Sequence, residues 1–153
     1  MPKLDLSAIA EHTGSDYPAP FGRDIAPRAR QRLGEAGGLT QFGVNLLRLP
    51  PGCWSAQRHW HTAEDEFTYV LSGTVVLVTD QGEEVLHAGD CAAFPANWPN
   101  GHHLINRGTC TAVCLEVGSR VAGDRIVYSD IDMVFDPDSD SFVHRDGAPY
   151  PPA

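Results

Sequence analysis

The sequence predicts an all-β fold, a single-domain sandwich or barrel, on three observations. Short runs rich in β-branched and aromatic residues recur along the chain, 15 glycines and 12 prolines separate them, and no long amphipathic helix lies between them. A chain of 153 residues is long enough to bury its own core as one domain. The sequence contains neither an internal repeat nor a low-complexity tract.

The predicted strands follow one another closely along the chain. They are residues 41–49, 55–61, 66–73, 74–80, 83–89, 91–94, 102–106 and 111–118, with 125–129 as a further candidate. The tripeptide Asp80, Gln81 and Gly82 between two of these runs is typical of a tight hairpin, because glycine readily adopts a positive φ. Residues 26–37 are weakly periodic and form one short helix candidate.

The two flanks differ from the middle of the chain. We expect an irregular N-terminal arm over residues 1–30, a barrel over 31–135, and a C-terminal extension over 136–153 that packs on the barrel or on a partner subunit. Because the open edges of a sheet need cover, we expect the N-terminal segment to pair with the sheet of a second copy in a homodimer.

The charge balance disfavours two classes of partner. The chain has 11 basic and 20 acidic residues, a formal net charge of −9, so neither nucleic acid nor an anionic membrane surface is an expected partner. No apolar run approaches the ~18 residues of a membrane span. The N-terminus lacks the apolar stretch of a signal peptide, so we expect a cytoplasmic protein.

Four cysteines are expected to be free thiols, as is usual in the cytoplasm. Cys110 and Cys114 fall on one face of a predicted strand, about 13 Å apart at ~3.3 Å per residue. That separation is too large for two thiolates to share one zinc ion at ~2.3 Å each. We therefore expect these two residues to be small packed core residues.

The strongest chemical signal is a pair of histidines in the second predicted strand. His59 and His61 point to one face of that strand with Cα atoms ~6.6 Å apart, while Trp60 points to the other. A turn then reverses the chain, and Glu66 opens the next strand beside the two histidines. Two imidazoles and a carboxylate suit a first-row transition metal, although a His-x-His pair alone is weak evidence.

The segment 51–73, PGCWSAQRHWHTAEDEFTYVLSG, resembles the first motif of the cupin superfamily. That motif has glycine, His-x-His, glutamate and glycine in this order. Four residues separate His61 from Glu66 and six separate Glu66 from Gly73, as in the family. The resemblance therefore favours Glu66 over Glu64 and Asp65 as the metal ligand.

The segment 89–106, GDCAAFPANWPNGHHLIN, resembles the second cupin motif with two departures. Asn97 stands where the family usually has glycine, and two extra residues precede the histidine. The His-x-x-x-Asn spacing returns from His102 to Asn106, which favours His102 over His103 as the fourth ligand. We expect only one of this pair to face inward, and His103 to lie on the surface.

The resemblance extends to small bacterial single-domain cupins and implies a double-stranded β-helix, also called a jelly-roll barrel. It implies one divalent transition metal ion, Fe, Mn, Ni, Co, Cu or Zn, on four ligands: His59, His61, Glu66 and His102. Such an ion keeps up to two positions for water or substrate. The likeness implies a fold and a site but no substrate.

Three further residues are candidates for the substrate pocket. Gln57 shares the face of His59 and His61, and Trp98 lies in a loop beside the second motif. Glu116 lies on a strand face opposite Val113 and Leu115; this second, more apolar face is the expected core face.

Two classes of function fit these features. The first is a metal-dependent enzyme acting on a small organic molecule, of the isomerase, cyclase, lyase or dioxygenase type. The second is a non-catalytic barrel that binds or senses a sugar or metabolite. The sequence has no fused DNA-binding domain, which disfavours a sensor that acts alone.

Overall fold

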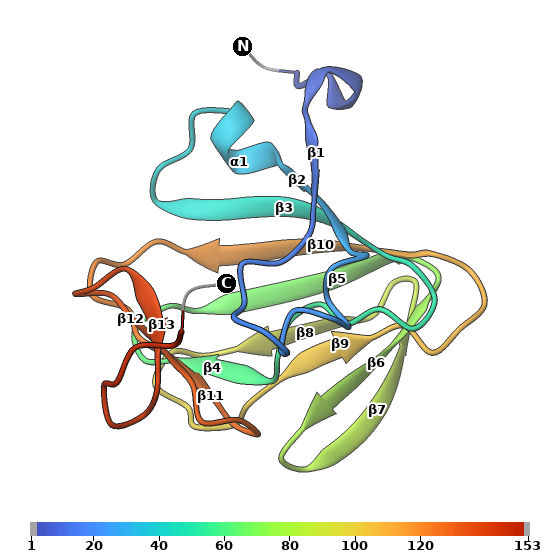
Figure 1. Cartoon of the computed structure of the whole chain (residues 1–153). Coiled ribbons are helices and arrows are strands. Elements are labelled where there is room, and N and C mark those ends of the chain that lie inside the picture. Colours follow the sequence, from blue (N-terminus) through green and yellow to red (C-terminus); the bar gives the residue numbers. More distant parts are fainter. Residues whose placement is uncertain (1–2, 152–153) are drawn as a thin grey trace.

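The computed structural model describes residues 3–151 and is a jelly-roll β-barrel made of three antiparallel sheets (Figure 1). The largest sheet has the strand order β1-β2-β3-β10-β5-β8. Its strands are β1 (Glu11–Thr13), β2 (Ala29–Arg32), β3 (Phe42–Leu49), β10 (Ala112–Ser119), β5 (Glu66–Ser72) and β8 (Cys91–Phe94).

Two smaller sheets complete the barrel. The first has the order β7-β6-β9 and contains β7 (Gly82–His87), β6 (Thr74–Thr79) and β9 (His103–Ile105). The second has the order β13-β12-β11-β4 and contains β13 (Ser141–Val143), β12 (Val134–Asp136), β11 (Ile126–Tyr128) and β4 (His59–His61). A 3-10 turn, Leu6–Ala8, and a short helix, α1 (Leu33–Ala36), are the helical elements of the described chain.

The core lies between the large sheet and the β7-β6-β9 sheet. Side chains on β5 alternate between the core and the outer surface: Thr68 and Val70 are buried, while Phe67, Tyr69 and Leu71 face outward. The main buried cluster is Leu47, Leu49, Cys53, Val70, Val75, Leu77, Leu86, Leu104, Ala112 and Cys114. As predicted, the β6-β7 hairpin turns at Asp80 to Gly82, and Gly82 has a φ of 120°.

The register of three strands sets out the inner wall of the barrel. Glu66 on β5 pairs with Gly118 on β10, which pairs with Gly43 on β3. The next inward-facing row is Thr68, Glu116 and Asn45. Cross-strand partners share a face of the sheet. Two glycines therefore lie beside Glu66, and the polar row of Thr68, Glu116 and Asn45 lies two residues further along the strands.

The predicted helix over residues 26–37 is wrong for most of its length. Its first half contains β2, which pairs with β3, and α1 covers only four residues. Glycines at 34, 37 and 38 limit helix growth, and Gly38 has a φ of 71°. Ala29 and Gln31 are buried in alternation, so pairing with β3 outweighs local helix propensity.

The predicted strand 55–61 is also too long, because only β4 is extended and paired. Ser55, Ala56 and Gln57 are all buried, which a strand with alternating faces does not allow. Hydrogen bonds hold this bend: the Ser55 amide donates to the Leu104 carbonyl, and the Ser55 hydroxyl accepts from the Leu104 amide.

Both flanks contain strands that were not predicted. The N-terminal arm is not wholly irregular, since β1 pairs with β2 at the edge of the chain's own sheet. β1 is the edge strand of that sheet, and the expected pairing of the arm with a second copy stays a prediction. The C-terminal extension packs on its own barrel, where β13 pairs with β12 and Phe142 lies 5.2 Å from the Tyr17 ring.

The cysteines are free, as expected, with Cys53 and Cys114 buried and Cys91 exposed. Cys110 is exposed rather than packed in the core. The expected core face of β10 is also wrong, because Ala112 and Cys114 on the other face are completely buried against β3 and β5. The described helices are all too short to span a bilayer.

Candidate metal centre

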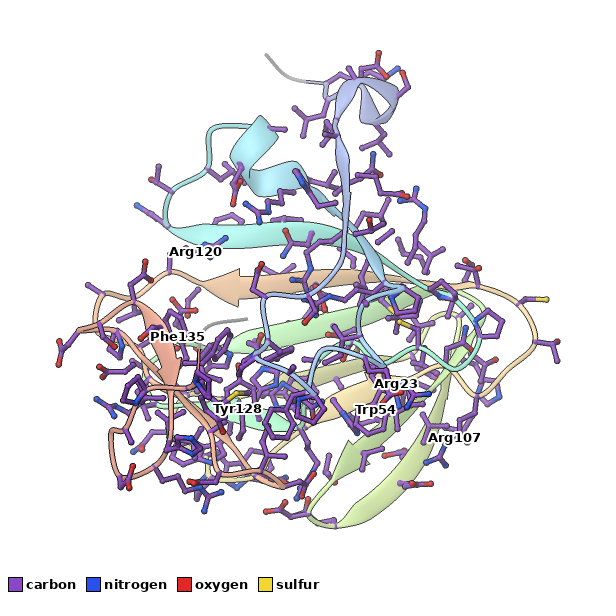
Figure 2. The ribbon with its side chains drawn as sticks, in the orientation of Figure 1. Arg23, Trp54, Arg107, Arg120, Tyr128 and Phe135 are labelled. Atoms are coloured by element: carbon purple, nitrogen blue, oxygen red, sulfur yellow. The ribbon has the colours of Figure 1, made fainter. Side chains whose placement is uncertain are left out.

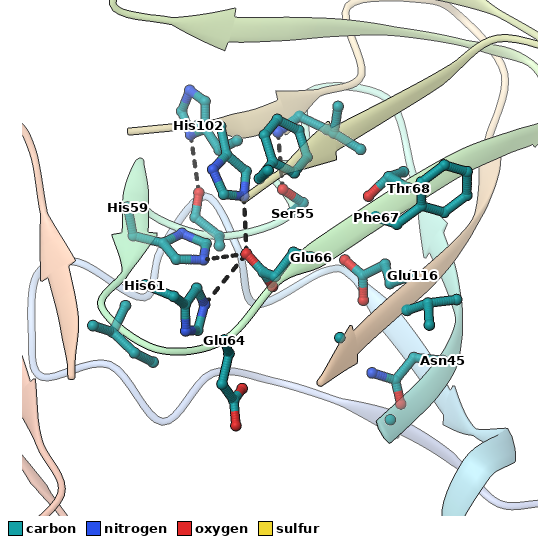
Figure 3. Close-up of a pocket in the computed structure, with 18 of the residues that line it drawn as sticks. Asn45, Ser55, His59, His61, Glu64, Glu66, Phe67, Thr68, His102 and Glu116 are labelled. Atoms are coloured by element: carbon teal, nitrogen blue, oxygen red, sulfur yellow. Dashed lines mark hydrogen bonds and ion pairs between the residues drawn. The ribbon is translucent and has the colours of Figure 1, made fainter. Parts of the chain in front are cut away.

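β4 carries two of the proposed ligands, His59 and His61, and β11 holds it in place. Tyr128 pairs with His59 and Ile126 pairs with His61 across this ladder. The alternation of β4 directs both imidazoles into the barrel, toward the start of β5 (Figure 3).

Three imidazoles converge on one carboxylate oxygen (Figure 3). Glu66 Oε2 lies 3.5 Å from His59 Nε2, 3.3 Å from His61 Nε2 and 2.9 Å from His102 Nε2. His59, His61 and Glu66 form a compact group of possible metal ligands. His102 lies beside this group and contacts it through Glu66.

The hydrogen bonds of the far ring nitrogens orient two of the histidines. His59 Nδ1 lies 2.7 Å from the Gln57 carbonyl oxygen and His61 Nδ1 lies 2.6 Å from Asp124 Oδ2. Each acceptor requires a proton on Nδ1, so the neutral ring directs the unprotonated Nε2 toward Glu66. This tautomer is the one that ligates a metal, and the donor set therefore fits a divalent transition metal.

His102 is held differently from the other two. Its backbone exchanges two hydrogen bonds with His59, and its ring stacks on Phe94 with centroids 3.5 Å apart. Its buried Nδ1 has no hydrogen-bond partner within residues 3–151. Stacking, rather than a hydrogen bond, sets the orientation of this imidazole.

Without a metal, the cluster perturbs the acidities of its own members. Burial raises the pKa of Glu66, but the three imidazoles outweigh burial and hold that pKa well below its ordinary value. Burial lowers the pKa of His61, but Glu66 and Asp124 outweigh it and raise this pKa to about 9. Burial dominates at His102 and lowers its pKa to about 4.

Asp124 is a functional residue that the sequence did not indicate. Besides His61, its carboxylate accepts hydrogen bonds from the Ala63 and Glu64 amides, at 2.7 and 3.2 Å. His61, Glu64 and Asp124 form a second close group. Both carboxylates of this second group accept hydrogen bonds from backbone amides, because Glu64 Oε1 also accepts one from the Val121 amide at 2.7 Å.

The neighbouring acid Asp65 is also engaged elsewhere, because its Oδ1 accepts from the Ala96 amide. Asn97, at the position where the cupin motif has glycine, has a φ of 57°. Asparagine tolerates this left-handed conformation better than most residues. The Asn97 amide donates to the His61 carbonyl at 2.9 Å, so the altered loop still ties the second motif to β4.

The metal centre lies in the wall of a cavity of about 290 Å³. Glu116 lines this cavity, whereas Gln57 and Trp98 are absent from its lining as far as the structure describes the chain. Gln57 Nε2 donates to the Phe21 carbonyl at 2.7 Å, and Trp98 is 49% exposed. Of the three expected pocket residues, Glu116 is thus the one that lines the cavity, and Gln57 contacts the candidate metal centre through its backbone carbonyl.

His103 is buried, which corrects the expected surface position. Alternation does put His102 and His103 on opposite sides, but both sides are covered. His103 Nδ1 lies 3.0 Å from the Ala56 carbonyl, and its ring packs against Trp54 with centroids 4.8 Å apart (Figure 2 labels Trp54).

Residues 45–118 match the family model described as a cupin domain. The chain is 48% identical to a sugar phosphate isomerase of the cupin superfamily from Silicibacter pomeroyi DSS-3. That match has a TM-score of 0.93 and covers 98% of this chain and 97% of the other. This protein belongs to the cupin superfamily.

A second similar cupin is a putative sugar phosphate isomerase from Acidithiobacillus ferrooxidans. It is 30% identical, with a TM-score of 0.74 over 84% of this chain and 83% of its own. The polyketide cyclase RemF from Streptomyces resistomycificus is 21% identical, with a TM-score of 0.60 over 78% of this cupin and 79% of its own chain, and shares the fold. No functionally curated protein matches the chain.

Proposed function

We propose that this cupin is a metal-dependent isomerase that interconverts the aldose and ketose forms of a small sugar derivative. The observation that carries this proposal is the His59, His61 and Glu66 group in the wall of an enclosed cavity. The reaction class is supported by the relative that is 48% identical over nearly the whole chain and is described as a sugar phosphate isomerase.

His59, His61, Glu66 and His102 would hold the ion, which is one of Fe, Mn, Ni, Co, Cu or Zn. When bound, such an ion polarises a carbonyl or hydroxyl oxygen as a Lewis acid. The cavity wall also limits access of water to a reactive intermediate.

Aldose–ketose isomerisation needs a group that moves one proton between adjacent carbons. The C–H bond beside the carbonyl breaks and its electron pair forms the C=C bond of an enediolate. The hydroxyl proton passes from one enediolate oxygen to the other, and the C=C electron pair then takes the carried proton at the former carbonyl carbon while the second oxygen becomes the new carbonyl. We assign this transfer to Glu116, a carboxylate in the cavity that is one row behind Glu66 (Figure 3). Its carboxylate forms an ion pair with Arg30 at 3.0 Å, which holds it in the cavity.

The first experiment measures metal content in protein purified without chelator, with His59→Ala as the control. We expect about one equivalent of a transition metal in the wild type and a large loss in the variant. A metal-free wild type with intact ligands would rule out the proposal. Oxygen uptake on addition of substrate would indicate a dioxygenase instead.

The second experiment follows exchange of substrate C–H hydrogen in D₂O by NMR, using aldoses and ketoses with and without a phosphate group. Deuterium incorporation that requires both metal and Glu116 is the expected result. Glu116→Gln should abolish exchange and leave the metal content unchanged. Tight binding of a sugar without any exchange would favour the alternative, a non-catalytic binding or sensing barrel.

We further propose that the protein acts in the cytoplasm as a homodimer. The free cysteines fit a reducing compartment. The dimer is supported by the exposed apolar side chains Phe67, Tyr69 and Leu71 on the outer face of the large sheet.

A further inference from the structure

Three arginines line the same cavity as the metal centre: Arg120, which lies 3.8 Å from Glu35, and the pair Arg28 and Arg30. Arg30 lies on β2 and Arg28 directly precedes this strand, so the alternation of β2 directs both toward the barrel interior, and both line the cavity. We propose that Arg28 and Arg30 form a subsite that binds the phosphoryl group of the substrate. This inference rests on the proposed isomerase function and specifies the substrate class of the same site.

The charge inside the cavity is the first argument. Arg30 pairs with Glu116 at 3.0 Å, whereas Arg28 donates to the neutral carbonyl of Ser55. The other cavity carboxylates are engaged elsewhere, Glu66 with the imidazoles and Glu64 with the Val121 amide. Arg30 therefore has a carboxylate partner, whereas the positive charge of Arg28 has none among the described residues.

Burial makes this excess charge unfavourable in the absence of an anion. Burial, together with the neighbouring charge of Arg30, lowers the pKa of Arg28. The buried Nε–H of Arg30 has no acceptor in the part of the chain that the structure covers. An anion with several acceptor oxygens compensates the charge and uses the free N–H donors of these side chains.

Phosphoryl oxygens suit this donor set better than a single carboxylate does. Each guanidinium presents planar N–H donors that bind phosphate oxygens in pairs, and two guanidinium groups match a dianion. Tyr17 and Tyr128 also line the cavity. Burial raises the pKa of both phenols, so they remain protonated.

The subsite lies within reach of the metal centre. Tyr128 packs 5.8 Å from the His59 ring, and Tyr128 and Arg28 belong to the same cavity lining. Glu116, the partner of Arg30, is in the row behind Glu66, and adjacent inward-facing rows are about 7 Å apart along a strand. One small sugar phosphate can thus extend from the metal centre to the arginines, past Glu116.

The test is a calorimetric titration of the full-length, metal-loaded protein with inorganic phosphate. We expect the wild type to bind phosphate, and Arg28→Gln to bind it about ten- to a hundredfold more weakly, because charge-assisted hydrogen bonds are lost. Arg107→Gln is the matched control. Arg107 pairs with Glu83 on the surface and lies on the side of the barrel away from Arg120 (Figure 2).

Two further variants keep the test decisive. Arg28→Lys keeps the positive charge, so it should fold even if Arg28→Gln does not. Its affinity for phosphate should be lower than that of the wild type and of Arg107→Gln, and higher than that of Arg28→Gln. The double variant Arg30→Gln/Glu116→Gln removes the ion pair as a unit and should also bind phosphate weakly.

Several outcomes would overturn the subsite. They are no phosphate binding by the wild type, equal affinities in Arg28→Gln and Arg107→Gln, tighter binding of acetate than of phosphate, or phosphate binding that depends on His59 and not on Arg28. The readout does not involve turnover. Phosphate binding without isomerisation would refute the isomerase alone, and isomerisation of neutral sugars without phosphate binding would refute the subsite alone.

Discussion

Asp124 lies outside the proposed ligand set, yet it orients one ligand and the turn beside it. One carboxylate oxygen contacts His61 Nδ1 at 2.6 Å, and the other accepts from the Ala63 and Glu64 amides. The same side chain therefore holds the His61 tautomer and fixes the turn that leads to Glu66.

Asp124→Asn is expected to weaken metal binding about 10- to 100-fold with little loss of fold stability. The amide oxygen of asparagine can still accept from the turn, but its NH₂ group opposes the Nδ1–H of His61 and disfavours the ligating tautomer. Competition titration with a chromogenic chelator measures the affinity. Glu83→Gln, which removes an exposed carboxylate paired with Arg107, is the control and should not change it.

Metal-free protein is expected to lose stability as the pH falls from about 6.5 to about 4. Burial lowers the pKa of His102 to about 4 and also lowers that of His103. Unfolded histidine titrates near ~6.5, so the unfolded chain binds more protons in this window and the free energy of unfolding falls. His61, whose pKa is raised to about 9, acts oppositely: its contribution is present below about pH 6.5 and is lost as the pH rises through about 9.

Urea unfolding across this range checks the acid limb, and two variants isolate one histidine. His103→Gln removes a buried titrating group but keeps a donor for the Ala56 carbonyl, so its stability should fall less steeply with acid. His87→Gln, at an exposed position, should behave as the wild type. Equal slopes in all three proteins would contradict the assignment.

At the scale of residues, motif spacing identified the site residues that lie close together in the sequence. It missed the residues that come near the site only in the folded chain. The structure has Glu66 between three imidazoles, while Glu64 and Asp65 bind backbone amides. Asp124 lies 63 residues from His61 in the chain, and no local pattern relates the two. Phe94 and His102 both belong to the second motif, but their stacking depends on how β8 packs against the segment that carries His102.

At the scale of elements, the row of glycines beside Glu66 shapes the cavity. Gly118 and Gly43 are cross-strand partners on β10 and β3, and both line the cavity. Neither has a positive φ among the described glycines, so backbone strain does not require glycine there. At Gly118 the missing side chain leaves space beside Glu66, whereas at Gly43 it makes room for the Arg120 guanidinium, which lies 2.8 Å from where a Cβ would be.

Gly118→Ala is expected to raise the KM for substrate about tenfold, since one methyl group in a pocket has an effect of this order. A Cβ at this position meets its nearest neighbours at 3.6 and 3.8 Å, which is ordinary contact, so the fold should be retained. Steady-state kinetics and thermal unfolding measure the two effects. Gly37→Ala, at the C-cap of α1 and outside the cavity lining, should leave KM unchanged.

The long strands were predictable, and so were some of the short ones. β3, β5, β6 and β10 have at least six residues of alternating or continuous apolar character, enough to reveal a period, and β8, β9 and β11 also lie within predicted strands. β1, β12 and β13, with three residues each, and β2, with four, were not predicted. Such segments become strands because a neighbouring segment offers them free hydrogen-bonding groups, which the local sequence does not record.

At the scale of the whole molecule, one face of the large sheet is more apolar than a free surface usually is. Phe67, Tyr69 and Leu71 on β5 are 37%, 37% and 47% exposed. Tyr69 pairs with Leu115 and Phe67 with Val117 on β10, so apolar side chains continue across the sheet. Burying this face against a second copy would remove the patch from water.

We expect light scattering to find a homodimer at micromolar concentration. Leu71→Glu should shift the protein toward monomer, because a charge at the centre of an apolar interface is costly to bury. Val85→Glu, at another exposed apolar position on β7, is the control and should stay dimeric. A monomeric wild type would refute the dimer.

The ladder between β4 and β11 has a consequence for the order of events in the life of the chain. All four proposed ligands lie before residue 103, but the carboxylate that aims His61 and the strand that flanks β4 come later, at Asp124 and in β11. A nascent chain that has not yet reached Asp124 and β11 contains all four proposed ligands. It lacks the residues that orient two of them, His59 and His61. We therefore expect metal binding to be among the last steps of maturation. A bound ion would then identify chains in which the C-terminal sheet has been synthesised and folded.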